Sequence, residues 1–189
     1  MSSPIFTLHT YTPAEAEQVT GVSVTMQRDW RRHGHIPKSD GGGHTRFDIV
    51  ELANLLVMRR LGDRLPLPEA KEIAEWAKNR VLRAALAESD CWGVDGTLPN
   101  DFTFKLLGES FLRRHVKGGR VVPGGKLIIW ANGKEFFCES LDAAFAQKTA
   151  FDEEVQGAVI VLDLDAMGGV LVDAVSETSP LKPIGVILP

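Results

Sequence analysis

Residues 20–37 read TGVSVTMQRDWRRHGHIP and predict the turn and second helix of a helix-turn-helix, followed by a stop. Gly21 suits the tight bend because glycine adopts a positive φ without steric cost. Ser23 suits the N-cap, where its hydroxyl accepts a hydrogen bond from a free backbone N–H of the first turn. Gly34 fits the position just past a helix, and Pro37 blocks continuation. We therefore expect one short helix between Ser23 and Gly34.

The expected helix, residues 23–33, has an apolar side and a polar side. Met26 and Trp30 are four residues apart and share the face that should pack inward. The polar and basic positions are candidate DNA contacts: Ser23, Thr25, Gln27, Arg28, Arg31 and Arg32. We expect Gln27 and Arg28 at base edges and the later arginines at phosphates, because the first half of a recognition helix enters the major groove. The alternative is a solvated surface helix with several arginines.

Residues 38–47 read KSDGGGHTRF and predict a wing. Three consecutive glycines suit the tip of a hairpin and would weaken a helix or a strand interior. We expect Arg46 to point from the returning strand toward a phosphate, and Phe47 to fold under it as a plug. The candidate DNA contacts of this segment are Lys38, His44, Thr45 and Arg46. A plain flexible loop is the alternative.

Further helices frame these two segments. Thr-Pro-Ala-Glu at residues 12–15 is a capping box with proline at the first helical position, and it predicts a helix over residues 13–19. Asp48 caps a second helix, in which apolar residues at helical spacing continue to residue 61. A third helix begins near residue 68 and extends to about residue 87.

Together these elements resemble the N-terminal winged helix-turn-helix of the MerR family. The shared order is a helix, a Thr-Gly-Val-Ser turn, a helix with Arg and Trp, a Gly-His-Ile-Pro exit, a glycine-rich wing ending in Arg-Phe, and two more helices. The resemblance covers roughly residues 8–77. In that family the recognition-helix arginine and the wing arginine contact DNA, which implies these roles for Arg28 and Arg46. The run around Trp30 is also similar to excisionase and phage-type modules.

Two positions depart from the MerR pattern. The family usually carries an aromatic residue just after the recognition arginine, where this chain has Asp29, and an apolar residue just before it, where this chain has Gln27. An acidic side chain near phosphate weakens binding unless a neighbour neutralises it. We therefore expect Asp29 to pair with a basic neighbour such as Arg32.

The second half of the chain mixes predicted strands, turns and short helices, unlike the mostly helical first half. Residues 89–101 are rich in turn formers and predict a linker between a DNA-binding domain, residues 1–88, and a second domain, residues 102–189. In the second domain we first expect a helix at 107–115, a hairpin of strands at 126–130 and 135–139, and a short helix capped by Ser140. A strand at 157–162 should follow, and a turn at Gly168-Gly169 should lead into another strand at 170–175. The chain should continue with a linker at 176–183 and an apolar tail at 184–188. The predicted class is α+β: a mostly helical winged helix-turn-helix followed by a smaller α+β domain with a mostly antiparallel sheet.

The charge distribution is compatible with a local DNA-binding surface. The first 90 residues carry 12 of the 21 Lys and Arg and 12 of the 25 Asp and Glu, so the net charge of −4 comes from the second half. Within residues 23–46, five Lys and Arg face two acids. A local basic patch binds phosphate even on an acidic protein, because salt screens distant charges over about 8 Å.

The remaining signals argue against an enzyme, a cofactor or a metal site. Cys91 and Cys138 form no CxxC pair, and we expect both to be free thiols, buried in the fold. Asp163 and Asp165 follow an apolar strand, but no further ligand has suitable spacing, so we expect a solvated strand end. No signal peptide or membrane span is predicted. We expect a cytoplasmic, nucleoid-associated protein.

The sequence thus predicts a sequence-specific transcriptional regulator of MerR-like type. It should bind double-stranded DNA as a homodimer through the recognition helix 23–33 and the wing 38–47. RNA polymerase or a small-molecule effector is a candidate further partner of the second domain. The alternative is a phage- or excisionase-like architectural DNA-binding protein whose second domain serves assembly.

Overall fold

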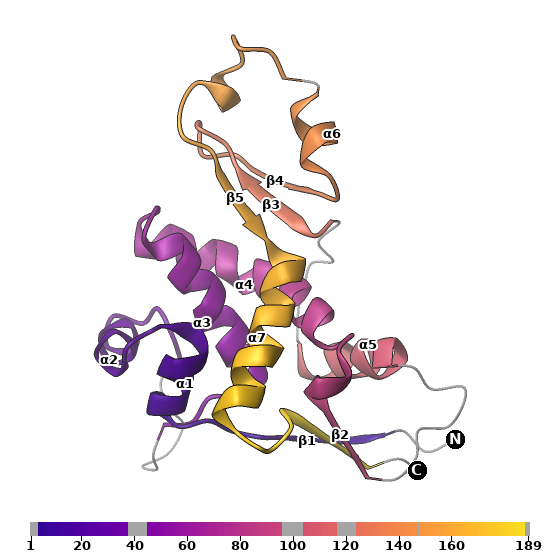
Figure 1. The fold of residues 1–189 in the computed structure, drawn as a ribbon. Coiled ribbons are helices and arrows are strands. Elements are labelled where there is room, and N and C mark those ends of the chain that lie inside the picture. Colours follow the sequence, from indigo (N-terminus) through magenta and orange to yellow (C-terminus); the bar gives the residue numbers. More distant parts are fainter. Residues whose placement is uncertain (1–3, 38–44, 96–103, 117–123, 147, 188–189) are drawn as a thin grey trace.

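The computed structural model describes residues 4–37, 45–95, 104–116, 124–146 and 148–187 of the chain. It is an α+β fold with 55% helix and two small sheets. In the view of Figure 1, the antiparallel sheet lies above the central helices and the mixed sheet lies below them. Helices therefore supply most of the core.

The first four helices are α1 (Pro13–Thr20), α2 (Val24–Arg32), α3 (Ile49–Gly62) and α4 (Leu67–Ala85). Each of the four predicted helices begins and ends within two residues of the observed bounds. α4 lies between α3 and α7 and packs along both (Figure 1). The apolar side of α4 is therefore buried against α3 and α7 of the same chain.

Two reciprocal capping boxes begin α1 and α3. The Thr12 hydroxyl accepts a hydrogen bond from the Glu15 backbone N–H at 3.3 Å, and the Glu15 carboxylate accepts one from the Thr12 backbone N–H at 2.6 Å. Asp48 and Glu51 exchange the same two bonds at 2.9 and 3.0 Å. Each box satisfies two backbone donors that a helix start leaves free. The predicted capping box at residues 12–15 is confirmed.

The strand predicted at residues 170–175 is wrong. These residues lie inside α7 (Leu164–Thr178), which also takes the first part of the predicted 176–183 linker. Asp163 begins this helix by accepting a hydrogen bond from the Ala166 backbone N–H at 3.0 Å. Burial at helical spacing outweighs the β preference of the valines here, and the buried residues are Leu164, Met167, Gly168, Leu171, Val172 and Val175.

The turn predicted at Gly168-Gly169 is wrong as well, because the pair lies in α7 where it meets α4. A Cβ atom at Gly168 would lie 2.5 Å from the Ala84 Cβ and 2.7 Å from the Val81 backbone oxygen. The two helices therefore approach so closely that no larger residue fits without movement. A packing constraint between distant segments, rather than a turn, accounts for this glycine.

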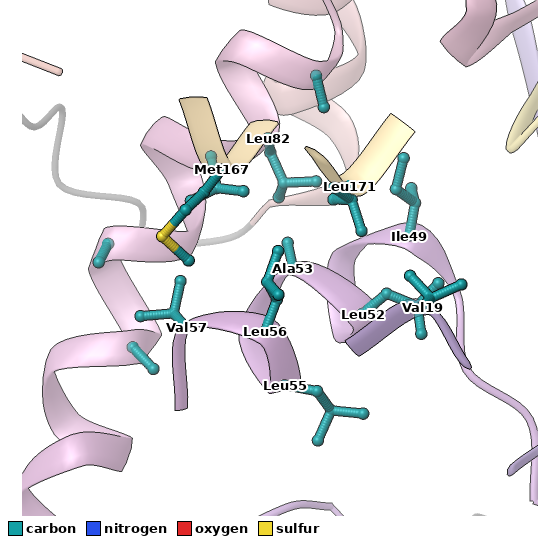
Figure 2. Packing of buried hydrophobic residues seen from close by; sticks show 14 of the residues in the cluster. Val19, Ile49, Leu52, Ala53, Leu55, Leu56, Val57, Leu82, Met167 and Leu171 are labelled. Carbon is teal, nitrogen blue, oxygen red and sulfur yellow. The ribbon is translucent and has the colours of Figure 1, made fainter. Parts of the chain in front are cut away.

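One buried cluster joins the helices. Figure 2 shows Val19, Ile49, Leu52, Leu56, Leu82, Met167 and Leu171 meeting from α1, α3, α4 and α7. The same cluster continues to Phe111, Leu127 and Ile184. The core therefore draws on residues of both predicted domains.

The mixed sheet brings three distant segments together. Its strands are β1 (Ile5–Leu8), β6 (Ile184–Ile187) and β2 (Trp92–Asp95), and β6 lies in the middle, antiparallel to β1 and parallel to β2. The predicted apolar tail at 184–188 is thus a central strand over its described part, with Ile184 and Val186 buried. The predicted linker at 89–101 contributes β2 to the same sheet.

The antiparallel sheet is close to its prediction. It contains β3 (Lys126–Ile129), β4 (Glu135–Cys138) and β5 (Ile160–Asp163) in the order β4-β3-β5. The predicted hairpin is confirmed, and the strand expected at 157–162 is found as β5. The fold also includes α5 (Phe104–His115), α6 (Leu141–Phe145), and two 3₁₀ turns at Ser89–Cys91 and Glu153–Val155.

Candidate nucleic-acid interface

The turn between α1 and α2 is held by side-chain and backbone hydrogen bonds. Gly21 has φ +72° and donates its N–H to the Glu17 carbonyl at 2.8 Å. The Thr20 hydroxyl donates to the Ala16 carbonyl at 2.6 Å and accepts from the Val22 N–H at 3.2 Å. This turn, as the sequence predicts, fixes the direction in which α2 leaves α1.

Both ends of α2 are capped. The Ser23 hydroxyl accepts a hydrogen bond from the Met26 N–H at 3.2 Å. At the other end Gly34 has φ +73°, and the His35 N–H donates to the Trp30 carbonyl at 2.7 Å, which is a Schellman arrangement. Trp30 is 7% exposed, so the inward face predicted for it is confirmed.

A contact from α4, which the sequence reasoning missed, supports the same end of α2. The Lys71 ammonium donates a hydrogen bond to the Gly34 carbonyl at 2.8 Å across 37 residues of chain. Cations are favourable at helix C-termini, where carbonyl groups lack partners. No local pattern around Lys71 indicates this contact, since it depends on the tertiary fold bringing the start of α4 to the Gly34 carbonyl.

Gln27 does not face solvent, and the expectation that it reads a base edge is wrong. Its side chain is 1% exposed. Its amide Nε2 donates to the Pro13 carbonyl at 2.9 Å and to the Val22 carbonyl at 2.8 Å. Gln27 precedes Trp30 by three positions, so it shares the inward side of α2. Helical spacing was the signal that could have placed it.

The outward side of α2 carries Thr25, Arg28 and Arg32, all exposed. Arg32 forms an ion pair with Asp29 at 3.1 Å, so the pairing expected for Asp29 is confirmed. Arg28 makes no hydrogen bond or ion pair with any residue that the structure describes. The guanidinium of Arg28 is therefore available to a ligand.

Arg31 joins α2 to both ends of the predicted wing. Its Nε donates to the Pro37 carbonyl at 3.1 Å, and its guanidinium carbon lies 5.4 Å from the centre of the Phe47 ring. Phe47 is 3% exposed and exchanges backbone hydrogen bonds of 2.8 and 2.9 Å with Tyr11. Phe47 is thus the predicted plug, and Arg31 has a structural contact that the sequence reasoning did not foresee.

Most of the predicted wing lies outside the described residues, including Lys38 and His44. Of the described part, Thr45 is half-buried and Arg46 is exposed. The pKa of Glu15 lies below its ordinary value because it accepts hydrogen bonds from Thr12, and the charges of Arg46 and His9 add to this effect. Arg46 therefore lies on the side of the molecule where α1 begins.

A small cavity lies beside Pro37 and Phe47, at the two ends of the predicted wing. Its lining includes Ile36, Phe47, Glu51 and Asn54, and its volume is about 70 Å³. The buried Asn54 Oδ1 has no hydrogen-bond partner among the described residues. Since a water molecule occupies about 30 Å³ in the liquid, this cavity fits one or two waters rather than a larger cofactor.

The described residues contain no group of three or more His, Cys, Asp or Glu that could hold a metal ion. Asp163 ends β5, and the side chains of Asp163 and Asp165 are each 43% exposed, as expected of a solvated strand end. Both are also ion-paired, Asp163 with Lys126 and Asp165 with Arg80. Both cysteines are free, Cys91 is buried and Cys138 partly exposed, and burial raises the pKa of the Cys91 thiol to about 12. In the described part, no helix has the length and hydropathy to span a membrane.

No protein-family model and no curated protein sequence matches this chain.

Proposed function

We propose that this chain is a MerR-like transcriptional regulator that reads double-stranded DNA with α2. The observation that carries the proposal is the two-sided character of α2. Trp30 and Gln27 are buried, whereas Thr25 and Arg28 are exposed on the other side. Arg28 has free donors in the first half of the helix, and a guanidinium in that position suits the two acceptors of a guanine edge.

We also propose that residues 38–47 act as a wing beside α2. Arg31 fixes both of its roots against the helix, so a phosphate contact at Arg46 would keep a set distance from α2. We assign Arg46, Thr45, Lys38 and His44 to the backbone-contacting part of the interface. Phosphate contacts position a protein on DNA and give affinity without reading sequence.

We propose that the DNA-binding form is a homodimer. Operators usually mirror a protein two-fold axis, and one winged domain buries little DNA surface. The interface is assigned to the second half, because α3 and α7 already cover α4. Phe136, Phe145 and Phe151 are exposed there and offer apolar surface. An RNA polymerase subunit or a small effector would act through the same half.

The test is selection of DNA sequences from a random duplex pool by the full chain. We expect an enriched, two-fold related motif, and Arg28→Ala should lose selectivity at one base pair of each half-site. The matched control is Arg113→Ala, which changes an exposed arginine on α5. No enrichment, or equal selectivity for Arg28→Ala and wild type, would contradict the proposal. Bending of DNA without sequence selection would favour an architectural, excisionase-like role.

A further inference from the structure

Strand β5 has one open edge among the residues that the structure describes, because the sheet order is β4-β3-β5. The Leu164 N–H donates to the Gly125 carbonyl at 2.8 Å, and the register of β3 with β5 continues this ladder. Hydrogen-bonded pairs alternate along antiparallel strands, so Ile160 and Leu162 also direct their backbone groups toward β3. Val161 therefore directs its N–H and C=O toward the open edge.

A groove lies between this part of the sheet and the C-terminal end of α3. Its volume is about 670 Å³, which is within the usual range of about 300–1,000 Å³ for ligand clefts. Its lining includes Arg60, Asp63, Arg64 and Leu65 at and just after the end of α3, together with residues 129–131, 133 and 158–162 of the sheet region. Val161 is 39% exposed, so the strand side of the groove is apolar as well as open.

The α3 side of the groove is positively charged. Arg60 and Arg64 are exposed, lie four positions apart, and form no ion pair with a described residue. Asp63 lies between them in sequence, but its carboxylate pairs with Arg59 at 2.5 Å. Two uncompensated guanidinium groups thus stand opposite a strand edge with a free donor and acceptor.

We propose that this groove binds an extended acidic segment of a partner protein, which adds to the sheet beside β5. Strand addition supplies main-chain hydrogen bonds, and alternate side chains supply specificity. Here the acidic side chains would meet Arg60 and Arg64, and the apolar ones would pack on Val161. The β5 strand of a second copy is a poorer occupant, because its one acid, Asp163, is already paired with Lys126.

The test uses fluorescence anisotropy with the full chain and a labelled hexapeptide of alternating Glu and Val. A hexapeptide of alternating Lys and Val is the charge control. We expect the acidic peptide alone to bind, with affinity that falls as salt rises. The double variant Arg60→Glu/Arg64→Glu should abolish binding, whereas Arg113→Glu on α5 should leave it unchanged.

A separate variant tests the proposed main-chain hydrogen bond from the Val161 N–H. Val161→Pro removes an N–H that points away from β3, and proline is tolerated on strand edges in that orientation, so the fold should survive. Loss of that donor should weaken the acidic peptide about tenfold, whereas Val161→Thr, which keeps the N–H, should bind within about twofold of wild type. Circular dichroism and a thermal melt check the fold of each variant.

Three peptide-binding results would overturn the proposal, and so would one result on the oligomeric state. The peptide-binding results are no binding of the acidic peptide up to about 1 mM, equal binding of the acidic and basic peptides, and unchanged binding by Val161→Pro. A dimer that forms with rising protein concentration and is lost in Val161→Pro, without peptide binding, would show that a second copy occupies the edge and would likewise overturn it. None of these measurements includes DNA, so they are independent of the proposed regulator function.

Discussion

The guanidinium of Arg80 in α4 and the carboxylate of Asp165 in α7 form a bidentate ion pair. Arg80 Nε lies 2.6 Å from Asp165 Oδ1, and Arg80 Nη2 lies 2.7 Å from Asp165 Oδ2. The Asp165 carboxylate also fills the space where a Cβ atom of Gly125 would lie. This pair connects the long helix α4, the first turn of α7 and the start of β3.

Arg80→Met should therefore destabilise the fold. We expect a loss of about 1–2 kcal/mol of unfolding free energy, below the value for a buried pair because the Asp165 side chain is 43% exposed. Urea unfolding followed by circular dichroism measures the change. Arg59→Met is the control, since Arg59 pairs with Asp63, the exposed C-cap residue of the same helix only four positions away. A loss in Arg59→Met as large as in Arg80→Met would contradict the assigned role.

Gly168 and Gly169 are neighbours in α7 and should respond in opposite ways to alanine. Gly168→Ala brings a Cβ against Ala84 and the α4 backbone, so we expect a loss of about 1–3 kcal/mol as the helices move apart. At Gly169 nothing lies within 4 Å of the added Cβ, and alanine should stabilise the helix by about 0.5–1 kcal/mol. Thermal melts of the two variants decide. Equal melting temperatures would exclude the close contact of α4 and α7.

Gln27 should contribute to stability rather than to base reading. Gln27→Ala leaves the carbonyls of Pro13 and Val22 without their donor, and we expect a loss of about 1–3 kcal/mol. Thr25→Ala, on the exposed side of α2, should change stability by less than about 0.5 kcal/mol. If Gln27→Ala unfolds like wild type and alters base preference, then Gln27 lies on the outward face of α2 and its buried position would be contradicted.

The pH dependence of stability should include Asp163. The Lys126 ammonium and the Ala166 N–H hold the pKa of Asp163 below its ordinary value. A carboxylate with a lowered pKa in the folded state adds stability above the unfolded-state pKa, and this stability is lost as the pH falls through the folded-state pKa. Asp163→Asn keeps the helix cap but should lose less stability than wild type between about pH 5 and pH 2.

Unfolding in urea at several pH values in that interval checks this expectation. Asp173→Asn, which changes an exposed acid of the same helix, is the control. The two variants should differ in slope, with Asp173→Asn following wild type. Parallel curves for wild type and Asp163→Asn would show that the pair with Lys126 contributes nothing.

The elements that the sequence predicted well are those with local signals. Thr12, Ser23 and Ser140 cap helices through bonds to residues three positions along the chain, and those bonds can be read from residue types alone. The strand prediction around Val170 is wrong because the helical state of this segment depends on packing against α4, which is distant in sequence. The placement of β6 between β1 and β2 depends on three segments far apart in the chain and has no local signature.

At the candidate interface, too, local signals predict some positions and tertiary contacts determine the others. The inward position predicted for Trp30 is confirmed, because Trp30 and Met26 form one apolar face on a helix that is otherwise mostly polar. The exposure predicted for Gln27 is wrong, because polarity alone does not imply exposure: two backbone carbonyls accept from its amide Nε2 inside the fold, although its Oε1 has no partner among the described residues. The contact of Arg31 with Pro37 and Phe47 needs the folded chain to bring both roots of the wing together.

Arg46 should contribute to DNA affinity without reading sequence, in contrast to Arg28. A wing follows the adjacent backbone, so Arg46→Ala should weaken specific and scrambled duplexes by the same factor and make the salt dependence shallower by about one ion. Arg28→Ala should cost about 1–3 kcal/mol on the specific duplex and little on the scrambled one. Titrations of wild type and both variants at three salt concentrations separate the two roles. Unchanged scrambled-duplex binding and salt slope in Arg46→Ala would mean that residues 38–47 do not touch DNA, and the winged part of the proposed function would be wrong.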